Sequence, residues 1–358
     1  MEPLKERYNT SYLTTLADAL VAAWSPFPRA SFLARVLADG WDELELKQRM
    51  TRIVESLHAD LPDDYRQALA VIQAAAPAFG GFEGMFFPEF VATHGLHDWE
   101  ASLPALADLT RWSSSEFAVR PFILADPERM MAHMREWAEH DNYHVRRLAS
   151  EGCRPRLPWA PALPAFKRDP SPILPILERL QADPEDYVRR SVANNLNDIS
   201  KDHPQLLLSI ARRWLGRQAH TDWIVKHACR SLLKAGDREA LALFDLGLPR
   251  GVTLTELQVE SDPVRIGDHL VFTFRLELAE AAKLRVEYAI DYLKANDKYG
   301  RKIFKISEKD VSAGAGGFRR RQSFADMTTR KHRPGRHRLA IIVNGEELGA
   351  TDFLVAQA

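Results

Sequence analysis

The sequence has little cysteine, no long apolar run and no recognisable leader, and each absence narrows the class of protein. Its two cysteines, Cys153 and Cys229, are too few for a disulfide framework and suit a reducing cytoplasm. No stretch approaches the roughly 18 uncharged apolar residues that a membrane-spanning helix needs. The opening residues MEPLKERYNT lack the basic segment, apolar run and cleavage site of a secretory signal. We therefore expect a cytoplasmic protein with no membrane partner.

Motifs that hold metals, cofactors or phosphates are also missing from the sequence. His140 and His144 stand four residues apart, but neither the glutamate of a zinc-protease motif nor a cysteine cluster accompanies them. The glycine-rich residues 314–317 do not form a nucleotide fingerprint, and we expect a flexible loop there. No lysine stands in surroundings that favour Schiff-base chemistry. The sequence thus predicts neither a metal site nor a cofactor.

Charge is nearly balanced overall but is unevenly distributed along the chain. The 358 residues carry a formal net charge of −1, with −7 over residues 1–100, +3 over 101–250 and +3 over 251–358. Residues 301–340 hold 12 Lys or Arg against three acidic residues, a local excess of +9. Such a block favours a polyanionic partner such as nucleic acid, although a solvated basic surface loop gives the same pattern.

The length and the patterning indicate two domains that divide near residue 250. In residues 1–250, apolar side chains recur at spacings of three and four, and proline-bearing breaks such as Asp126-Pro127 mark helix starts. In residues 251–358, short strand-like runs are separated by turn signals such as Asn344-Gly345. These runs are 254–259, 269–276, 284–288 and 337–343. The sequence therefore predicts a mainly α protein, with a helical domain over 1–250 and a small immunoglobulin-like β-sandwich over 251–358.

The helical part contains an internal repeat. The strings VRRLAS, VRRSVA and VKHACR begin at Val145, Val188 and Val225, which are 43 and 37 residues apart. A basic opening of an apolar helix at this spacing is typical of the second helix of HEAT-type repeats, whose period is about 40–47 residues. We therefore expect a HEAT-like α-solenoid, with the paired arginines repeating along its concave face. Alternatively, these arginines only pair with acids of the repeat such as Asp141 and Asp186.

Three segments in the middle of the chain carry more polar and aromatic residues than packing requires. Trp112 and Glu116 are four residues apart, and we expect them to share one helical face. The helix that begins at Val145 should end at Gly152 and lead into a proline-rich loop that holds Trp159. A third helix ends in polar residues that favour caps and turns, namely Asn194, Asn195, Asn197 and Asp198.

These motifs and their order resemble the AlkC branch of the AlkC/AlkD DNA alkylation-repair glycosylases. The strings VRRLASEG, RPRLPW and YVRRSVANNLNDISKDHP carry the resemblance, which extends over essentially the whole chain. It implies a monofunctional DNA glycosylase that removes cationic alkylated bases (3-methylcytosine, 1-methyladenine and 3-methyladenine) from duplex DNA. It also implies that the base is not flipped into a pocket, unlike in glycosylases generally. In this branch the appended β-domain is associated with lesion engagement.

The implied chemistry gives roles to the carboxylates and tryptophans of the central segments. A carboxylate beside the sugar stabilises the positive charge that develops as the glycosidic bond breaks, and tryptophan faces hold cations. The resemblance makes Glu116 the first catalytic candidate, because Trp112 and Glu116 mirror a Trp-x-x-x-acid arrangement of the AlkD branch. Asp198 is the second candidate, and Trp159 is a candidate for the wall of the site.

Each of these assignments has a structural alternative. Glu116 has Arg120 four residues ahead as an ion-pair partner, and Asp198 has Lys201 three residues ahead. The two tryptophans would then only pack between repeats. The rival function is a catalytically inert HEAT scaffold that binds damaged DNA or a protein partner, and we expect a monomer.

Basic residues of both domains are the expected contacts to DNA. Arginines contact phosphates and position the duplex rather than specify the base. In the β-domain, we expect residues 314–321 and 330–338 to form arginine-rich loops. The sequence leaves open which arginine of each Val-Arg-Arg pair faces DNA. The predicted contacts are Arg120, Arg146, Arg147, Arg154, Arg156, Arg189, Arg190, Lys226, Arg230, Arg319, Arg320, Arg321, Arg330, Lys331 and Arg333.

Overall fold

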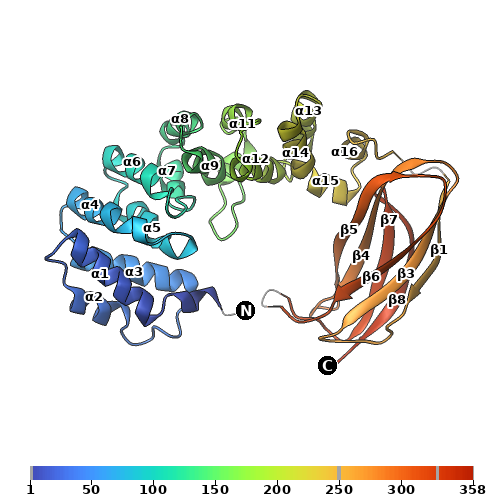
Figure 1. Cartoon of the computed structure of the whole chain (residues 1–358), viewed down its shortest axis with the longest axis horizontal. Coiled ribbons are helices and arrows are strands. Elements are labelled where there is room, and N and C mark those ends of the chain that lie inside the picture. The colour runs from blue at the N-terminus through green and yellow to red at the C-terminus, as the bar shows by residue number, and fades with distance from the viewer. Residues whose placement is uncertain (1–2, 248–250, 328–329, 358) are drawn as a thin grey trace. The chain divides into compact units, whose positions relative to one another are not determined.

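The computed structural model describes residues 3–247, 251–327 and 330–357, which divide into two compact units (Figure 1). The first unit contains the residues up to 207 together with 213–228, and the second contains 208–212 and the residues from 229 onward. The domain boundary predicted at residue 250 falls on 248–250, outside the described residues. Among the residues described, no helix combines the length and the apolar character needed to cross a bilayer.

Helices form the first unit and the beginning of the second. The α-helices are α1 (Thr10–Ala23), α2 (Arg29–Val36), α3 (Leu46–Asp60), α4 (Tyr65–Ala75), α5 (Phe86–His94), α6 (Trp99–Leu109), α7 (Val119–Ala125), α8 (Pro127–Trp137), α9 (Tyr143–Gly152), α10 (Pro164–Arg168), α11 (Leu174–Leu180), α12 (Asp186–Ile199), α13 (Pro204–Trp214), α14 (Ala219–Ala228), α15 (Arg230–Ala235) and α16 (Arg238–Ala242). The 3-10 helices are η1 (Leu4–Arg7), η2 (Ala76–Ala78) and η3 (Phe82–Gly84). The predicted start at Asp126-Pro127 is confirmed, because the Asp126 side chain accepts the Arg129 N–H and Pro127 opens α8.

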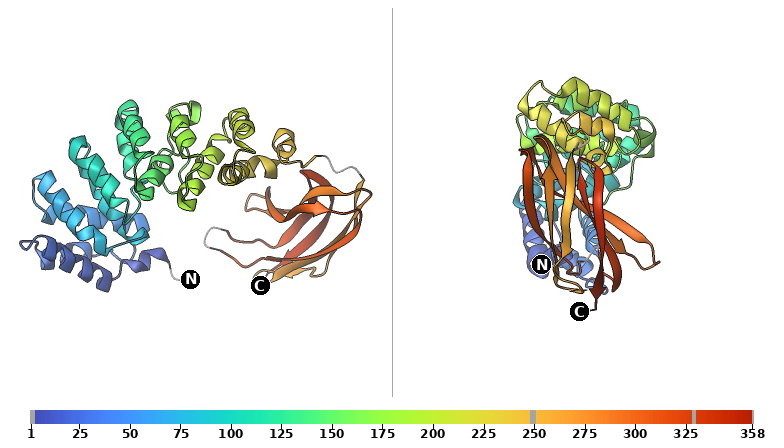
Figure 2. Two further views of the ribbon diagram at one scale, coloured as in Figure 1. Left: turned by 45° about the horizontal axis from the view of Figure 1, so that its top comes forward. Right: turned by 90° about the vertical axis from the view of Figure 1, so that its right-hand side faces the viewer.

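The packing of α9, α12 and α14 confirms the predicted repeat. Val145, Val188 and Val225 lie on these three helices and are buried, and α12 packs against both of the others. In a second row, α8 packs against α9, and α11 packs against both α9 and α12 (Figure 2). Equivalent positions of the repeat therefore lie side by side on one row of helices.

The asparagines of α12 connect it to its two neighbours. Asn195 Nδ2 donates to the Ser150 carbonyl of α9 at 2.8 Å, and Asn197 Nδ2 donates to the Ala228 carbonyl of α14 at 2.7 Å. Both carbonyls lie in the last turn of a helix, where carbonyl groups lack the N–H of a following turn. These two asparagines therefore join successive repeats, which explains why α12 has buried amides near its end.

Gly152, the last residue of α9, permits a close approach to α7. A β-carbon at this position would lie 2.5 Å from Cγ2 of the buried Val119. We expect Gly152→Ala to lower the free energy of unfolding by about 1–3 kcal/mol, because a close-packed interior has no room for the added methyl group. Urea unfolding followed by helical circular dichroism measures this. The control is Gly80→Ala in the same unit, where the nearest atom is 3.6 Å away and the change should stay within about 0.5 kcal/mol. Equal effects of the two substitutions would contradict the close packing.

The second unit is a β-sandwich of two sheets. Its strands are β1 (Val252–Val259), β2 (Val264–Arg265), β3 (His269–Leu278), β4 (Ala282–Leu293), β5 (Tyr299–Val311), β6 (Gly314–Ser323), β7 (Gly335–Val343) and β8 (Glu346–Ala356). One sheet has the order β1-β3-β6 and the other the order β2-β8-β7-β4-β5. All four predicted runs fall within strands, and the predicted turn at Asn344-Gly345 joins β7 to β8 with φ angles of 47° and 77°. Buried apolar side chains from both sheets form its core.

The predicted arginine-rich loop over 314–321 is wrong, because these residues form most of strand β6. Gly316 and Gly317 pair with Leu276 and Arg275 of β3, and the Phe318 ring stacks on the buried Phe274 ring at 4.8 Å. This pairing and packing outweigh the low strand propensity of glycine. The loop predicted over 330–338 is shorter than expected, because β7 already begins at 335.

Candidate active site

A cavity of about 610 Å³ opens among helices of the first unit. Trp112, Glu116 and Trp159, which the sequence singled out, all line it, together with Glu151 and Tyr187. Trp112 and Trp159 are 37% and 59% exposed, so these indoles do not simply fill the core. The structure therefore gathers carboxylates and aromatic faces from three separate segments around one space.

Trp112 and Glu116 reach the cavity from the loop between α6 and α7, so the prediction that they share one helical face is wrong. Hydroxyl groups of a serine run take over the hydrogen bonds that a helix would need. Ser115 Oγ donates to the Leu106 carbonyl at 2.8 Å, and Ser114 Oγ accepts the Glu116 N–H at 3.3 Å. Serine side chains that bond to nearby backbone compete with helix formation in this way.

Arg147 of α9 holds Glu116 in the cavity wall. Its Nη1 lies 2.5 Å from Glu116 Oε2 and donates to Ser114 Oγ at 2.7 Å, and that hydroxyl also donates to Glu116 Oε2 at 2.8 Å. The guanidinium lies 4.8 Å from the centre of the Tyr187 ring. The alternative pairing of Glu116 with Arg120 is not formed. Glu116 therefore presents a carboxylate that is fixed by a cation and a hydroxyl group.

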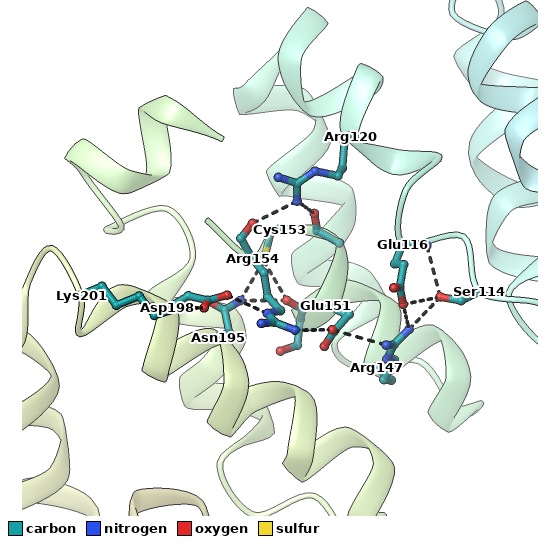
Figure 3. A network of polar contacts seen from close by, with 12 residues as sticks. Ser114, Glu116, Arg120, Arg147, Glu151, Cys153, Arg154, Asn195, Asp198 and Lys201 are labelled. Atoms are coloured by element: carbon teal, nitrogen blue, oxygen red, sulfur yellow. Dashed lines mark hydrogen bonds and ion pairs between the residues drawn. The ribbon is translucent and has the colours of Figure 1, made fainter. Parts of the chain in front are cut away.

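A row of alternating acids and bases continues from this pair (Figure 3). Arg147 Nη2 lies 3.5 Å from Glu151 Oε1, which accepts from Arg154 Nη1 at 2.6 Å. Arg154 Nε donates to Asp198 Oδ2 at 2.8 Å, and Lys201 Nζ donates to Asp198 Oδ1 at 3.0 Å. Burial lowers the pKa of Arg147 and of Arg154, but the neighbouring carboxylates more than offset it, so each pKa is raised. Both arginines stay charged, and the row keeps its geometry.

Glu151 is a cavity residue that the sequence analysis missed. It is four residues after Arg147 on α9, a spacing that places the two side chains on one helical face. The spacing of four residues between Arg147 and Glu151 was the feature of the sequence that could have indicated Glu151. Asp198, by contrast, is not among the residues that line the cavity and is buried behind Arg154. Its pairing with Lys201, weighed as the alternative, is present.

The predicted DNA contact Arg120 lies in the protein interior. Its Nη1 donates to the carbonyls of Gly152 and Arg154, both at 3.0 Å, and its Nε donates to the Pro161 carbonyl at 3.0 Å. Burial, with a smaller contribution from the Arg154 guanidinium, lowers the pKa of Arg120 to about 10. Arg120 therefore fixes the two ends of the loop that carries Trp159, and it is not available to a phosphate in this arrangement.

The loop itself holds Trp159 outward. Trp159 has a φ of 64°, a left-handed conformation that is uncommon for a residue other than glycine. Lys47 Nζ of α3 donates to the backbone carbonyl of Trp159. The Trp159 ring contacts the Phe82 ring edge-on, with 5.5 Å between the ring centres. Side chains from two other parts of the unit, Lys47 and Phe82, thus support one exposed indole.

The two arginines of each Val-Arg-Arg string have different environments. The first one holds the turn before its helix: Arg146 donates to the His140 carbonyl at 2.9 Å and to Asp183 at 2.6 Å, and Arg189 donates to the Asp183 carbonyl at 2.8 Å. Of the second ones, Arg147 pairs with Glu116 of the cavity wall at 2.5 Å, and Arg190 is exposed beside Asp186 at 2.5 Å. Pairing with an acid, the structural alternative, is therefore present for both arginines of each string, and Asp186 itself pairs with Arg190.

The other predicted contacts lie at several places on the two units. Arg156 is partly exposed and pairs with Asp202 at 2.7 Å, and Lys226 and Arg230 are half-buried on α14 and α15. On β6, Arg319 pairs with Glu260 at 2.7 Å, Arg320 donates to a neighbouring carbonyl and Arg321 bonds to His269. The remaining three, Arg330, Lys331 and Arg333, lie in the segment before β7.

Comparison with known proteins identifies relatives over the full length of the chain. A family model described as a DNA alkylation repair enzyme matches residues 88–232, and one described as the C-terminal Ig-like domain of uncharacterised protein YhaZ matches 253–357. Protein YhaZ of Bacillus subtilis is 48% identical over 99% of this chain and 100% of its own length. The structure of the Pseudomonas fluorescens alkylpurine DNA glycosylase AlkC, bound to DNA containing an abasic site analog, matches with a TM-score of 0.95. It is 43% identical and covers 99% of this chain and 100% of the other. The predicted immunoglobulin-like domain is confirmed.

Proposed function

Because the chain belongs to the AlkC family of DNA alkylation repair enzymes, we propose that it is a monofunctional DNA glycosylase. It hydrolyses the N-glycosidic bond of cationic alkylated bases, namely 3-methylcytosine, 1-methyladenine and 3-methyladenine, in duplex DNA. The observation that carries this proposal is the single cavity that holds Glu116 and Glu151 beside Trp112 and Trp159. The enzyme acts as a cytoplasmic monomer without a cofactor.

The carboxylates of the cavity, which Arg111 and Arg154 also line, suit the breaking of a bond to a cationic base. As the bond between the sugar carbon and the base nitrogen breaks, its electron pair neutralises the base and leaves positive charge on the sugar. The fixed carboxylate of Glu116 stabilises that charge, and a fixed charge needs no reorganisation during the reaction. Water then bonds to the sugar carbon, and its proton passes to Glu116 or to Glu151.

The exposed indoles suit the cationic partner. Trp112 and Trp159 line the cavity and are exposed, and the faces of aromatic rings attract a positively charged base or sugar. Because these two side chains lie in an open cavity, we propose that they approach the lesion from a groove of the duplex. The damaged base then stays stacked in the DNA. The fluorescent base 2-aminopurine, placed at the lesion position of the duplex, tests this. Its fluorescence is quenched while it is stacked and rises when it is flipped out of the duplex. Unchanged fluorescence on binding is the expected result, and a strong increase would contradict the unflipped arrangement.

Release of free base from three duplexes, each with one of the proposed lesions, tests the function directly. We expect the free alkylated base and an uncleaved strand with an abasic site, at a rate well above that of spontaneous loss. Tight binding of all three duplexes without release of a base would instead support the alternative function, a catalytically inert scaffold that recognises damaged DNA.

DNA affinity is expected to depend steeply on salt. If the basic residues of the two units neutralise about four phosphates, binding releases the counterions of those phosphates. A rise from about 50 to about 200 mM monovalent salt then weakens binding about 10²-fold. Fluorescence anisotropy with an undamaged duplex measures the slope. A flat response over this range would count against phosphate contacts as the main source of affinity.

A further inference from the structure

A second cavity, of about 490 Å³, lies within the β-sandwich unit and has a strongly cationic lining. It is formed where β4 ends, where β5 begins and by the segment that precedes β7. Its basic residues are Lys294, Arg301, Lys302, Arg330, Lys331 and Arg333. No Asp or Glu is among the described residues that line it. This is the place where the basic block of the sequence is concentrated in three dimensions.

Most of the cations around this cavity lack an acidic partner. Arg301 is neutralised by Asp291 at 2.9 Å and by a second acid, and Lys331 is 4.0 Å from an acid on its own segment. Within the described part of the chain, no carboxylate lies within 4 Å of the basic groups of Lys294, Lys302, Arg330 or Arg333.

The arginines that follow in sequence behave differently. Arg336 pairs with Asp352 at 3.6 Å and Arg338 pairs with Glu347 at 2.9 Å. These contacts separate the paired arginines of β7 from the four cavity cations that have no acidic partner. Unpaired cations that share one cavity repel each other, which an anion would relieve.

Polar atoms at the cavity are buried without partners. The His332 side chain lines the cavity and is 7% exposed, and neither of its ring nitrogens has a hydrogen-bond partner. The Nε of Arg330 is also buried and unpaired, while its guanidinium lies 4.8 Å from the Tyr292 ring centre. Buried donors without acceptors are rare in folded proteins. Burial and the adjacent Arg330 lower the pKa of His332, so the neutral ring has one N–H to donate.

A glycine gives one of the cations its position. A β-carbon at Gly300 would lie 2.3 Å from Cε of Lys294, so the absence of a side chain lets Lys294 lie across this part of the cavity wall. The cavity is thus a built arrangement of strand ends rather than a row of free surface lysines.

We propose that this cavity binds a phosphate group. Guanidinium and ammonium groups bind phosphate oxygens through charge-assisted hydrogen bonds, and the unpaired His332 and Arg330 nitrogens supply further donors. In the working enzyme, the phosphate is a backbone diester of the duplex. The assignment of the phosphate to a DNA backbone diester rests on the proposed function, whereas the anion site itself does not.

Two full-length double variants with the same charge change test the proposal. Lys302→Gln with Arg330→Gln removes cavity cations, and Arg336→Gln with Arg338→Gln removes paired cations outside the cavity. Anisotropy with an undamaged duplex at several salt concentrations gives affinity and slope. We expect the cavity variant to bind about tenfold more weakly with a salt slope about one unit smaller, and the control to change less than about threefold. Thermal unfolding in inorganic phosphate forms the second arm and also shows that both variants fold.

The outcomes separate the two sources of phosphate. Loss of DNA affinity in the cavity variant alone supports the backbone diester. Stabilisation of the wild type by inorganic phosphate, lost in the cavity variant while DNA binding is unchanged, supports the anion site but overturns the diester assignment. Equal behaviour of both variants in both arms overturns the proposal. Because the duplex carries no lesion, these results stand even if the wild type releases no base.

Discussion

Replacing Arg154 by methionine is expected to lower the free energy of unfolding of the helical unit by about 3–5 kcal/mol. The Arg154 guanidinium is buried between Glu151 at 2.6 Å and Asp198 at 2.8 Å. Methionine keeps much of the apolar stem but leaves two buried carboxylates with one cation fewer. The cost of a buried charge without its partner is large, whereas the net gain from forming a buried pair is small.

Arg156→Met is the matched control for this prediction. Arg156 belongs to the same loop and pairs with Asp202 at 2.7 Å, but both side chains are partly exposed. Exposed pairs contribute about 0–1 kcal/mol, so the control should unfold almost as the wild type does. Urea unfolding followed by helical circular dichroism measures both variants. Similar midpoints for the two would mean that the row of charges does not stabilise the α9–α12 region.

Glu116→Gln is expected to reduce the single-turnover rate of base release by about 10²-fold or more, with DNA binding kept within about threefold. Glutamine has nearly the same shape and still accepts hydrogen bonds from Arg147 and Ser114, so the loop should keep its position. What is lost is the negative charge that stabilises the developing cation of the sugar. A loss in the rate with little change in the dissociation constant separates this electrostatic role from a structural one.

Glu139→Gln is the control for the catalytic variant. Glu139 also pairs with an arginine, Arg179 at 3.2 Å, but it does not line the cavity. Its substitution should leave both rate and affinity near those of the wild type. Full activity in Glu116→Gln would contradict the assignment and transfer the carboxylate role to Glu151, the other acid of the cavity.

The parts of the fold that could be predicted from sequence are those that local patterns determine. The apolar periodicity and the proline breaks predicted helices before residue 250, and the repeat of Val145, Val188 and Val225 predicted that α9, α12 and α14 are equivalent. The short alternating runs predicted the strands of the second unit. The resemblance to the AlkC branch, carried by long strings in α9 and α12, is confirmed by relatives over the whole chain.

The parts that could not be predicted depend on partners distant in sequence. Glu116 is held by Arg147, which lies 31 positions later, while the nearer Arg120 turns inward to backbone carbonyls. The serine run replaced the expected helical face with a loop, because its hydroxyls bond to backbone atoms. Segment 314–321 is a strand because β3 pairs with it. Periodicity does not carry information on such long-range contacts.

Release of a cationic and of a neutral lesion from the same duplex sequence tests most directly whether fixed carboxylates drive base release. The wild-type enzyme, with a chelator present, is mixed in excess with duplexes that carry either 3-methyladenine or O6-methylguanine, and free base is measured over time. If fixed carboxylates act on a base that already carries positive charge, 3-methyladenine is released and O6-methylguanine stays attached. Equal release of both, or tight binding with release of neither, would show that the carboxylates of the cavity do not act on a cationic base.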